Sequence, residues 1–398
     1  MGRAGRLRTC IAAAVALLGA NAATADPTSR PATRPGHVPP IASDLRVQVE
    51  AAIERSLARL QRTQQPDGGW RGFGEMSDPA ITSLIGKCFI QSPRHGPGHP
   101  VVQRAVKFVL ANKKPDGGIY GDDSVKSYSA SVALMFLSAI GDPALKNEIA
   151  SQQFFLKENQ WHEGKNDDSG RPIDKSHPWY GGAGYGHGKR PDLSNTQMML
   201  EALHQSGLPA TDPAFQRALV FIQRCQMCGD TNDQPFAAKA TDGGFIYSPA
   251  NGGESKAGTV TVGDDQILRS YGSMTYAGFK SLLYANVHRD DHRVQLAWRW
   301  IRSHYTLDEN PNMPGRQSRE GLYYYYHVFA RALKAWGEPV VVDLDGRPHH
   351  WREDLCRKLL AGQKPDGSWV NDAERWLEHN ADLVSAYSIL ALQEAIDH

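Results

Sequence analysis

Apolar side chains recur at intervals of three and four residues along most of this chain, a spacing that predicts amphipathic helices. The first such stretch begins at Ser43-Asp44, which can cap a helix, and its apolar stripe continues to Leu60. Two later stretches begin with Asp78-Pro79 and Asp212-Pro213, each placing a capping carboxylate before a proline in the first turn. Strand patterns are scarce, and Val340–Val342 is the only candidate. The pattern therefore predicts an all-α protein.

The helical stretches fall into six consecutive pairs. Small residues dominate the second helix of the second pair, from Ser127 to Ala133, and they suit a helix that packs closely on its neighbours. Six such pairs can close into a ring with the second helices inside and the first helices outside. The predicted pairs are 43–60 with 81–90, 102–110 with 128–140, 149–156 with 194–205, 212–222 with 270–283, 291–305 with 321–333, and 351–360 with 382–396.

A short turn sequence, first seen as Gln65-Pro66-Asp67-Gly68-Gly69-Trp70, joins the two helices of several pairs. Proline fixes φ, the aspartate can bond the backbone, and glycine accepts the positive φ of a sharp reversal. The four copies carry aspartate at positions 67, 116, 242 and 366, so 49, 126 and 124 residues separate them. One period near fifty residues and two double periods predict six units, with the third and fifth lacking the turn signature.

The composition narrows the range of functions. Of the 398 residues 40% are hydrophobic, which is enough for a sizeable core. A net charge of +1 argues against a nucleic-acid partner recognised through bulk charge. A mean hydropathy of −0.48 argues against an integral membrane protein.

The N-terminal residues have the pattern of a secretory signal peptide. Three arginines precede the apolar run Ile11 to Ala20, which is too short to span a bilayer, and Ala23-Thr24-Ala25 is a cleavage site of the A-x-A type. We therefore expect an exported protein, periplasmic or secreted, cleaved after Ala25 and without a transmembrane segment thereafter. The predicted domains are the signal peptide at 1–25, a flexible Pro-rich tether at 26–42 and one helical domain at 43–398.

The turn sequences resemble the QW motif of the terpenoid cyclase and protein prenyltransferase superfamily, whose fold is an α/α toroid. The match is good at Gln65–Trp70 and Gln363–Trp369, and partial at Asn112–Ile119 and around Asp242. In that superfamily the motif ties helix ends together. The stretch Leu268–Gly278 is similar to exported bacterial squalene-cyclase-like repeat proteins. The resemblance covers Ser43 to His398 and implies an (α/α)6 toroid of six helical hairpins.

The resemblance does not bring the chemistry of the class II cyclases with it. These enzymes protonate an alkene with an acid from an Asp-x-Asp-Asp motif, which this chain lacks. The nearest fragments are Asp122-Asp123, Asp264-Asp265 and Asp343–Gly346, of which the last has the context of a loop. The first two precede inner helices. There they either cap the helix N-terminus or form an acid pair at the mouth of a cavity, where like charges raise one pKa.

Metal binding is not predicted either. Protein prenyltransferases hold zinc through Asp, Cys and His, but their Asp-x-Cys spacing is absent and Cys228-Gly229-Asp230 has the reverse order. The single Cys-x-x-Cys pair, Cys225 and Cys228, is weak evidence for zinc, and a local disulfide or two packed thiols explain it as well. We therefore predict no metal and no cofactor.

Aromatic residues are the remaining candidates for a site. Aromatic walls suit a carbocation through cation–π contact, or a sugar ring by stacking. Four consecutive tyrosines on one helix cannot all face one side, so the helix orients them differently. A polar insert at 161–189 adds further aromatic residues. The predicted catalytic residues are Asp122, Asp123 and His327, and the predicted substrate-binding residues are Trp179, Tyr180, Asp264, Asp265, Tyr271, Tyr276, Tyr323 and Tyr324.

Three functions remain open at the level of sequence. The first is a terpenoid-cyclase-like protein that binds a ligand in a central, aromatic-lined cavity. The second is a carbohydrate-active α/α barrel, a hydrolase or lyase with paired carboxylates facing each other across a cleft. The third is a non-catalytic scaffold whose centre is filled by its own side chains. We expect a small-molecule or glycan ligand and no nucleic acid, and the oligomeric state is not predicted.

Overall fold

The computed structural model describes residues 40–72, 74–121, 125–186 and 188–397, all within the unit Pro35–His398. The predicted signal peptide at 1–25, and the predicted tether at 26–42 up to residue 39, lie outside the described residues. The boundaries of these two segments therefore stay predictions.

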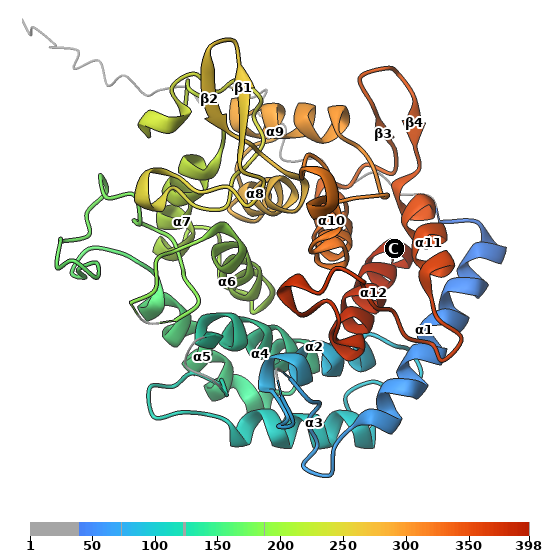
Figure 1. Cartoon of the computed structure of the whole chain (residues 1–398). Helices are drawn as coiled ribbons and strands as arrows, with labels where there is room; N and C mark the ends of the chain where they lie inside the picture. Colours follow the sequence, from blue (N-terminus) through green and yellow to red (C-terminus); the bar gives the residue numbers. More distant parts are fainter. Residues whose placement is uncertain (1–39, 73, 122–124, 187, 398) are drawn as a thin grey trace, which may run out of the picture. The chain divides into compact units, whose positions relative to one another are not determined.

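Twelve α-helices in the described residues form the six predicted pairs, and the all-α prediction is confirmed (Figure 1). The inner helices pack on one another in chain order, and α12 packs on α2, which closes the ring. Each outer helix packs on the inner helix that precedes it around the ring, as α3 packs on α2 and α1 packs on α12. The outer helices are α1 Ser43–Thr63, α3 Pro100–Ala111, α5 Lys146–Asn159, α7 Pro213–Cys225, α9 His292–Ser303 and α11 Trp351–Gly362; the inner helices are α2 Pro79–Ile90, α4 Lys126–Ile140, α6 Leu193–Gln205, α8 Gly272–Tyr284, α10 Leu322–Trp336 and α12 Ala381–Ile396.

Burial explains why the two sets of helices differ in sequence. Almost every residue of the inner helices is buried, whereas outer helices such as α7 and α9 bury one face and expose the other. Small residues let the inner helices approach closely. A Cβ added at Gly86 of α2 would lie 2.4 Å from the ring of Phe136 on α4. None of the described helices is both long and apolar enough to cross a membrane.

A glutamine at the end of the outer helix ties the first, third and fourth copies of the turn to the following pair. The Gln64 amide donates hydrogen bonds to the carbonyl oxygens of Gly68 in the turn (2.8 Å) and Val101 at the start of α3 (3.0 Å). Gln226 bonds Gly243 and Arg293 of α9 in the same way, at 2.9 and 2.8 Å. The bridging residue of the first copy is thus Gln64, one position before the predicted motif.

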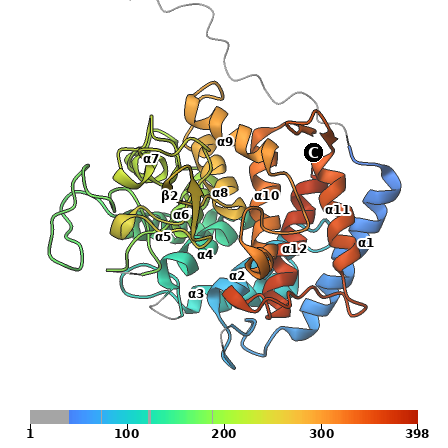
Figure 2. The ribbon, with the colours of Figure 1, turned by 45° about the horizontal axis from the view of Figure 1, so that its top comes forward.

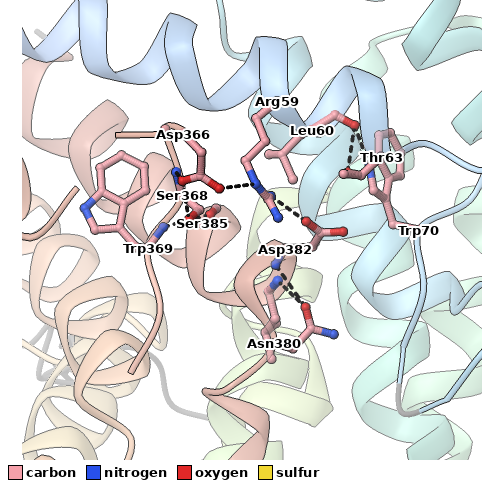
Figure 3. Close-up of polar contacts among 12 residues, drawn as sticks. Arg59, Leu60, Thr63, Trp70, Asp366, Ser368, Trp369, Asn380, Asp382 and Ser385 are labelled. Atoms are coloured by element: carbon pink, nitrogen blue, oxygen red, sulfur yellow. Dashed lines mark hydrogen bonds and ion pairs between the residues drawn. The ribbon is translucent and has the colours of Figure 1, made fainter. Parts of the chain in front are cut away.

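The same arrangement closes the ring between the last pair and the first. The Gln363 amide donates to Gly367 (3.1 Å) and to Ala52 of α1 (2.8 Å). Figure 3 shows that Arg59 of α1 reaches across this seam to Asp382 of α12 at 2.6 Å and to Asp366 of the turn at 3.4 Å. Figure 2 shows α1 beside α11, its neighbour across the seam.

The third unit lacks the contiguous turn sequence, as predicted, yet it makes the same contacts as the other turns. Gln160 follows α5 and donates to the carbonyl oxygens of Gly181 and Ala214 of α7, both at 2.9 Å. The backbone N–H of Ala183 then donates to the hydroxyl of Thr196 in α6, as that of Trp70 donates to Thr82 in α2. An insert separates Gln160 from Gly181 in sequence, so the contiguous motif is missing while its contacts are present.

Two small β-hairpins occur in the described loops between helices, one between α7 and α8 and one between α10 and α11. β3 Val341–Val342 covers two of the three residues of the predicted strand and pairs with β4 Pro348–His349. The residues from Asp343 to Gly346 lie in the loop between them, as predicted, and the Asp343 carboxylate accepts two backbone N–H groups there. A second hairpin, β1 Thr259–Val262 with β2 Asp265–Leu268, was not predicted. Most residues of this hairpin are exposed, so the alternation of buried and polar positions that marks a strand is absent.

Candidate functional site

A cavity of about 320 Å³ lies where the N-terminal ends of all six inner helices converge. Its size is within the range of small-molecule sites. The remaining lining comes from the two long inserts and from the connection before α12. The lining residues are Asp78, Ala80, Ile81, Val125, Tyr128, Tyr185, Ser194, Tyr247, Tyr271, Ser273, Met274, Gly321, Tyr324, Trp376, Leu377, Leu383 and Tyr387.

Six tyrosines dominate the wall of this cavity, and they are linked to one another and to α6. The hydroxyl groups of Tyr128 and Tyr387 share a hydrogen bond with an O–O distance of 2.9 Å. The Tyr324 hydroxyl lies 3.0 Å from the hydroxyl of Ser194 and accepts a bond from the Gln197 amide at 3.0 Å. Burial raises the pKa of Tyr128 to about 12, so this phenol stays neutral at neutral pH. The cavity therefore presents aromatic faces with fixed, uncharged hydroxyls.

Asp192 is a buried carboxyl beside two of these tyrosines. It caps α6, accepting the backbone N–H of Asn195 at 2.8 Å and its side-chain amide at 2.9 Å. Burial raises the pKa of Asp192 to about 6, against hydrogen bonds from Asn195 and Tyr247 that favour the charged form. Tyr247 is in turn hydrogen-bonded to Tyr185. A group that can carry a proton near neutral pH thus contacts the cavity wall through tyrosine hydroxyls.

A strap formed by residues 371–380 covers the cavity between α10 and α12. Glu378 anchors the strap, because its buried carboxylate accepts the backbone N–H of Tyr324 at 2.8 Å and the side-chain amide of Asn371 at 2.6 Å. Burial raises the pKa of Glu378 to about 7, although the hydrogen bonds from Asn371 and the Tyr324 backbone lower it. The strap then turns the side chains of Trp376 and Leu377 into the cavity wall.

The backbone of this strap is strained at the residues that reach the cavity. Trp376 and Leu377 adopt φ values of 57° and 64°, which residues other than glycine rarely adopt. The Trp376 ring packs over Gly321, where an added Cβ would lie 3.0 Å from the ring. Arg375 lies 4.6 Å from the ring centroid and pairs with Glu320 at 2.8 Å. The contacts of Glu378 and Arg375 hold this conformation in place.

Comparison with known proteins identifies the fold. No protein-family model matches the chain. The computed structure is similar to the type II terpene cyclase MstE from Scytonema, with a TM-score of 0.54 and 13% identity over 88% of this chain and 99% of MstE. The fold is a terpenoid cyclase-like toroid.

Other toroids with different activities share this architecture. A family 76 glycoside hydrolase from a bovine Bacteroides thetaiotaomicron strain matches with a TM-score of 0.51 and 11% identity, over 87% of this chain and 78% of the hydrolase. D-mannose isomerase matches with a TM-score of 0.52 and 11% identity, over 89% and 98% of the two chains. The architecture alone therefore does not select a reaction.

One curated protein is similar in sequence over a short segment. Drimenyl diphosphate synthase from Streptomyces showdoensis is 41% identical over 68 residues, which are 17% of this chain. The matched segment covers only 13% of the length of the synthase.

The toroid places only two of the predicted substrate-binding residues, Tyr271 and Tyr324, on the cavity wall. Tyr276 instead packs in the core against Tyr325 and Phe329, with ring centroids 5.5 and 5.1 Å away. Tyr323 packs against the ring of Tyr326 at 5.5 Å and does not line the cavity. Of the four consecutive tyrosines one therefore lines the cavity, because successive side chains on α10 point in different directions.

The remaining predicted binding residues lie away from this cavity. Trp179 packs on Trp161 in a small second core of the insert, and the Tyr180 hydroxyl donates to Glu163. Asp264 lies in the turn of the β1–β2 hairpin, and Asp265 begins β2 and pairs with Lys239. The interpretation that they cap an inner helix is wrong, because the hairpin intervenes and α8 begins only at Gly272.

Of the three predicted catalytic residues, the described part of the chain includes His327 alone. Asp122 and Asp123 lie outside the described residues, so their role stays a prediction. His327 is buried on α10 and stacks on Tyr387, with ring centroids 5.5 Å apart. It is one layer below the cavity and does not line it. Burial lowers the pKa of His327 to about 3, so the imidazole is neutral at neutral pH.

A buried ion network occupies the opposite end of the inner helices. Glu201 of α6 pairs with Lys280 of α8 and Arg331 of α10, and Glu394 of α12 pairs with Arg331 at 2.8 Å. Arg331 and Lys280 overcome the burial of Glu201 and hold its pKa well below the usual range. Cations are favoured here, because the C-terminal ends of helices carry partial negative charge. A second cavity of about 490 Å³ borders this network, lined in part by Lys87.

Sequence analysis missed most of the cavity wall and both of its neighbouring acids. Asp192 had a usable signal, since Pro191-Asp192 directly precedes the apolar pattern of α6. The position of Glu378 just before an inner helix suggests at most a solvated cap, and its contact with the start of α10 has no signal in the sequence.

Proposed function

We propose that this protein binds an apolar small molecule of the isoprenoid class in the cavity at the centre of the toroid. The observation that carries the proposal is the wall itself: six tyrosines and Trp376 enclose about 320 Å³ at the converging ends of the inner helices. Aromatic faces attract apolar groups and cations, while the uncharged hydroxyls add a few directional contacts.

The comparisons support this ligand class. MstE, which has the same fold, carries geranylgeranyl dihydroxybenzoate as substrate in one solved structure and merosterolic acid A as product in another. The short segment similar to drimenyl diphosphate synthase points in the same direction.

The geometry supports binding more strongly than proton-initiated cyclisation. Protonating an alkene requires a strong acid, whereas the two buried acids at this cavity, Asp192 and Glu378, have pKa values of about 6 and 7. Neither acid is among the residues that line the cavity. We therefore place no alkene protonation on the described residues.

A carbohydrate-active function has less support at this cavity. Asp78 is the one carboxyl among the described lining residues, and its Oδ1 accepts the backbone N–H groups of Ala80 and Ile81. A pair of facing carboxylates would therefore need Asp122 or Asp123. The glycoside hydrolase and isomerase neighbours keep this function as the alternative.

Isoprenoid binding is tested by thermal denaturation of the protein with a panel of isoprenoids and their diphosphates and a panel of oligosaccharides. An isoprenoid at about a hundred times its Kd is expected to add about 2.7 kcal/mol, which raises Tm by about 3–4 °C for a domain of this size. Leu383→Trp places an indole in the cavity and is expected to abolish the shift, while Val47→Trp on the exposed face of α1 retains it. Shifts with oligosaccharides alone would overturn the proposal in favour of the carbohydrate function. No shift with either panel would favour the scaffold.

We further propose that the protein is exported and cleaved after Ala25, from the basic, apolar and A-x-A pattern of its first residues. The expected outcome is that the protein recovered outside the cytoplasm begins at Asp26, as read by N-terminal sequencing. Recovery of the protein only in the cytoplasm, beginning at residue 1 or 2, would contradict export.

A further inference from the structure

Cys228, Asp230 and His292 come together on the outer wall of the toroid, away from the cavity. One ligand atom from each of the three lies within 4.8 Å of the other two, and among the described residues no other three such side chains gather in this way. Cys228 is buried, whereas Asp230 and His292 are exposed. None of them lines either cavity. Sequence analysis predicted no metal because Cys228-Gly229-Asp230 reverses the Asp-x-Cys order and the Cys-x-x-Cys has no second pair, and it did not bring His292 of α9 into the group.

The loop that carries Cys228 and Asp230 is built rigidly. The carbonyl oxygen of Cys228 accepts the backbone N–H of Asn232 at 2.9 Å, and the Asn232 amide donates to Gln226 at 2.7 Å. The Gly229 N–H donates to the carbonyl oxygen of Ala240 at 2.8 Å. A Cβ added at Gly229 would lie 2.6 Å from the Ala238 carbonyl oxygen, so only glycine allows this close approach. The reversal fixes the backbone positions from which both side chains extend.

Separate contacts hold His292 against this loop. Arg293 follows His292, and its carbonyl oxygen accepts a hydrogen bond from the Gln226 side-chain amide at 2.8 Å. The Arg293 guanidinium donates to the side chain of Gln223 of α7 at 3.0 Å. The His292 Nε2 lies 3.8 Å from the nearer carboxylate oxygen of Asp230. The start of α9 is therefore positioned by the bridging glutamine of the repeated turn, independently of any contact among the three donors.

We propose that Cys228, Asp230 and His292 bind a Zn²⁺ ion that clamps the loop after α7 to the start of α9. A thiolate, an imidazole nitrogen and a carboxylate oxygen form a donor set that zinc prefers over magnesium or calcium. Both exposed side chains can rotate by the small amount needed to reach bonding distance of about 2.0–2.3 Å. Three protein ligands leave the fourth position to a water molecule. Binding replaces the thiol proton of Cys228, which is released to solvent.

The test is a titration of the metal-free full-length chain with Co²⁺ and Zn²⁺. We expect one equivalent of Co²⁺ to produce a thiolate-to-cobalt charge-transfer band. Zn²⁺ affinity, measured by competition with a chromophoric chelator, is expected to fall in Cys228→Ser and His292→Asn by about 100-fold or more, beyond the 10–100-fold that loss of an outer-sphere contact causes. Asp230→Asn is expected to weaken Zn²⁺ binding in the same direction.

Matched controls separate ligation from folding. Cys356→Ser removes another buried thiol and His288→Asn another exposed imidazole, and both are expected to keep the band and the affinity. Metal-free melting curves show whether each variant is folded. If Cys228→Ser does not fold, His292→Asn decides, because its side chain is exposed. Absence of the band in the wild type, or its persistence in the folded Cys228→Ser or His292→Asn variant, would overturn the proposal.

Discussion

Replacing Arg331 by methionine is expected to lower the free energy of unfolding by about 3–5 kcal/mol, as loss of one partner from a buried ion pair does. Arg331 is the shared partner of Glu201 and Glu394, and Glu201 is completely buried. Without the guanidinium, Glu201 keeps only Lys280 and Glu394 keeps only Lys334 among the ion pairs within the described part of the chain. Methionine preserves much of the apolar stem, so the loss reports the stranded carboxylates. Chemical denaturation at neutral pH measures it.

An exposed pair and a double variant sharpen this test. Arg357→Met removes a half-exposed partner of Glu353 one turn away on α11, and a loss within about 0.5 kcal/mol is expected. Combining Arg331→Met with Glu394→Gln is expected to cost less than the sum of the single changes, because the second change removes one stranded charge. If Arg331→Met lowers the free energy of unfolding by less than about 1 kcal/mol, the unpaired carboxylates of Glu201 and Glu394 are not destabilising and the prediction is wrong.

Acid is expected to weaken the wild type relative to His327→Gln by about 3 kcal/mol between pH 7 and pH 4. The unfolded chain binds a proton at this histidine below a pKa of 6.5, whereas burial keeps the folded side chain neutral down to a pKa of about 3. The unfolded state therefore binds more protons in this window, and stability contributed by His327 falls as the pH falls. The variant lacks this loss.

The difference between the two proteins isolates His327 from groups with the opposite sign. Asp192 and Glu378 have pKa values raised by burial to about 6 and 7, so each favours the folded state as the pH falls through those values. Both groups are present in both proteins and cancel in the difference. Urea denaturation across pH 4–7 gives the two curves, and the exposed His288→Gln serves as the control for removing an imidazole. Parallel curves for the wild type and His327→Gln would contradict the prediction.

The fold could be predicted because the outer helices and the turns carry local signals. An outer helix such as α9 has one apolar face, and the turn at Asp366 needs proline, aspartate and glycine at fixed positions. These signals are read within a few residues. The turn of the third unit was missed where an insert separates Gln160 from Gly181, and the β1–β2 hairpin was missed because it buries little.

The cavity wall could not be predicted to the same extent. Inner helices such as α8 and α10 are buried all round, so hydrophobic periodicity does not reveal which side faces the centre. Tyr276 and Tyr324 look equivalent in sequence, yet one packs between helices and the other lines the cavity. The orientation depends on how each helix is rotated against two neighbours, which is a property of the assembled ring.

Closure of the ring between α12 and α2 has a consequence for the order of events during synthesis. The Arg46 guanidinium bonds the carbonyl oxygen of Ile396, 350 residues away, so the seam joins the first of the described helices to the last of them. At a synthesis rate of about 5–20 residues per second, roughly 20–70 s pass between the synthesis of α1 and that of α12, which completes its packing. Throughout that interval the nascent chain is an open arc with two apolar ends, which makes it a natural client for chaperones until its last turn emerges.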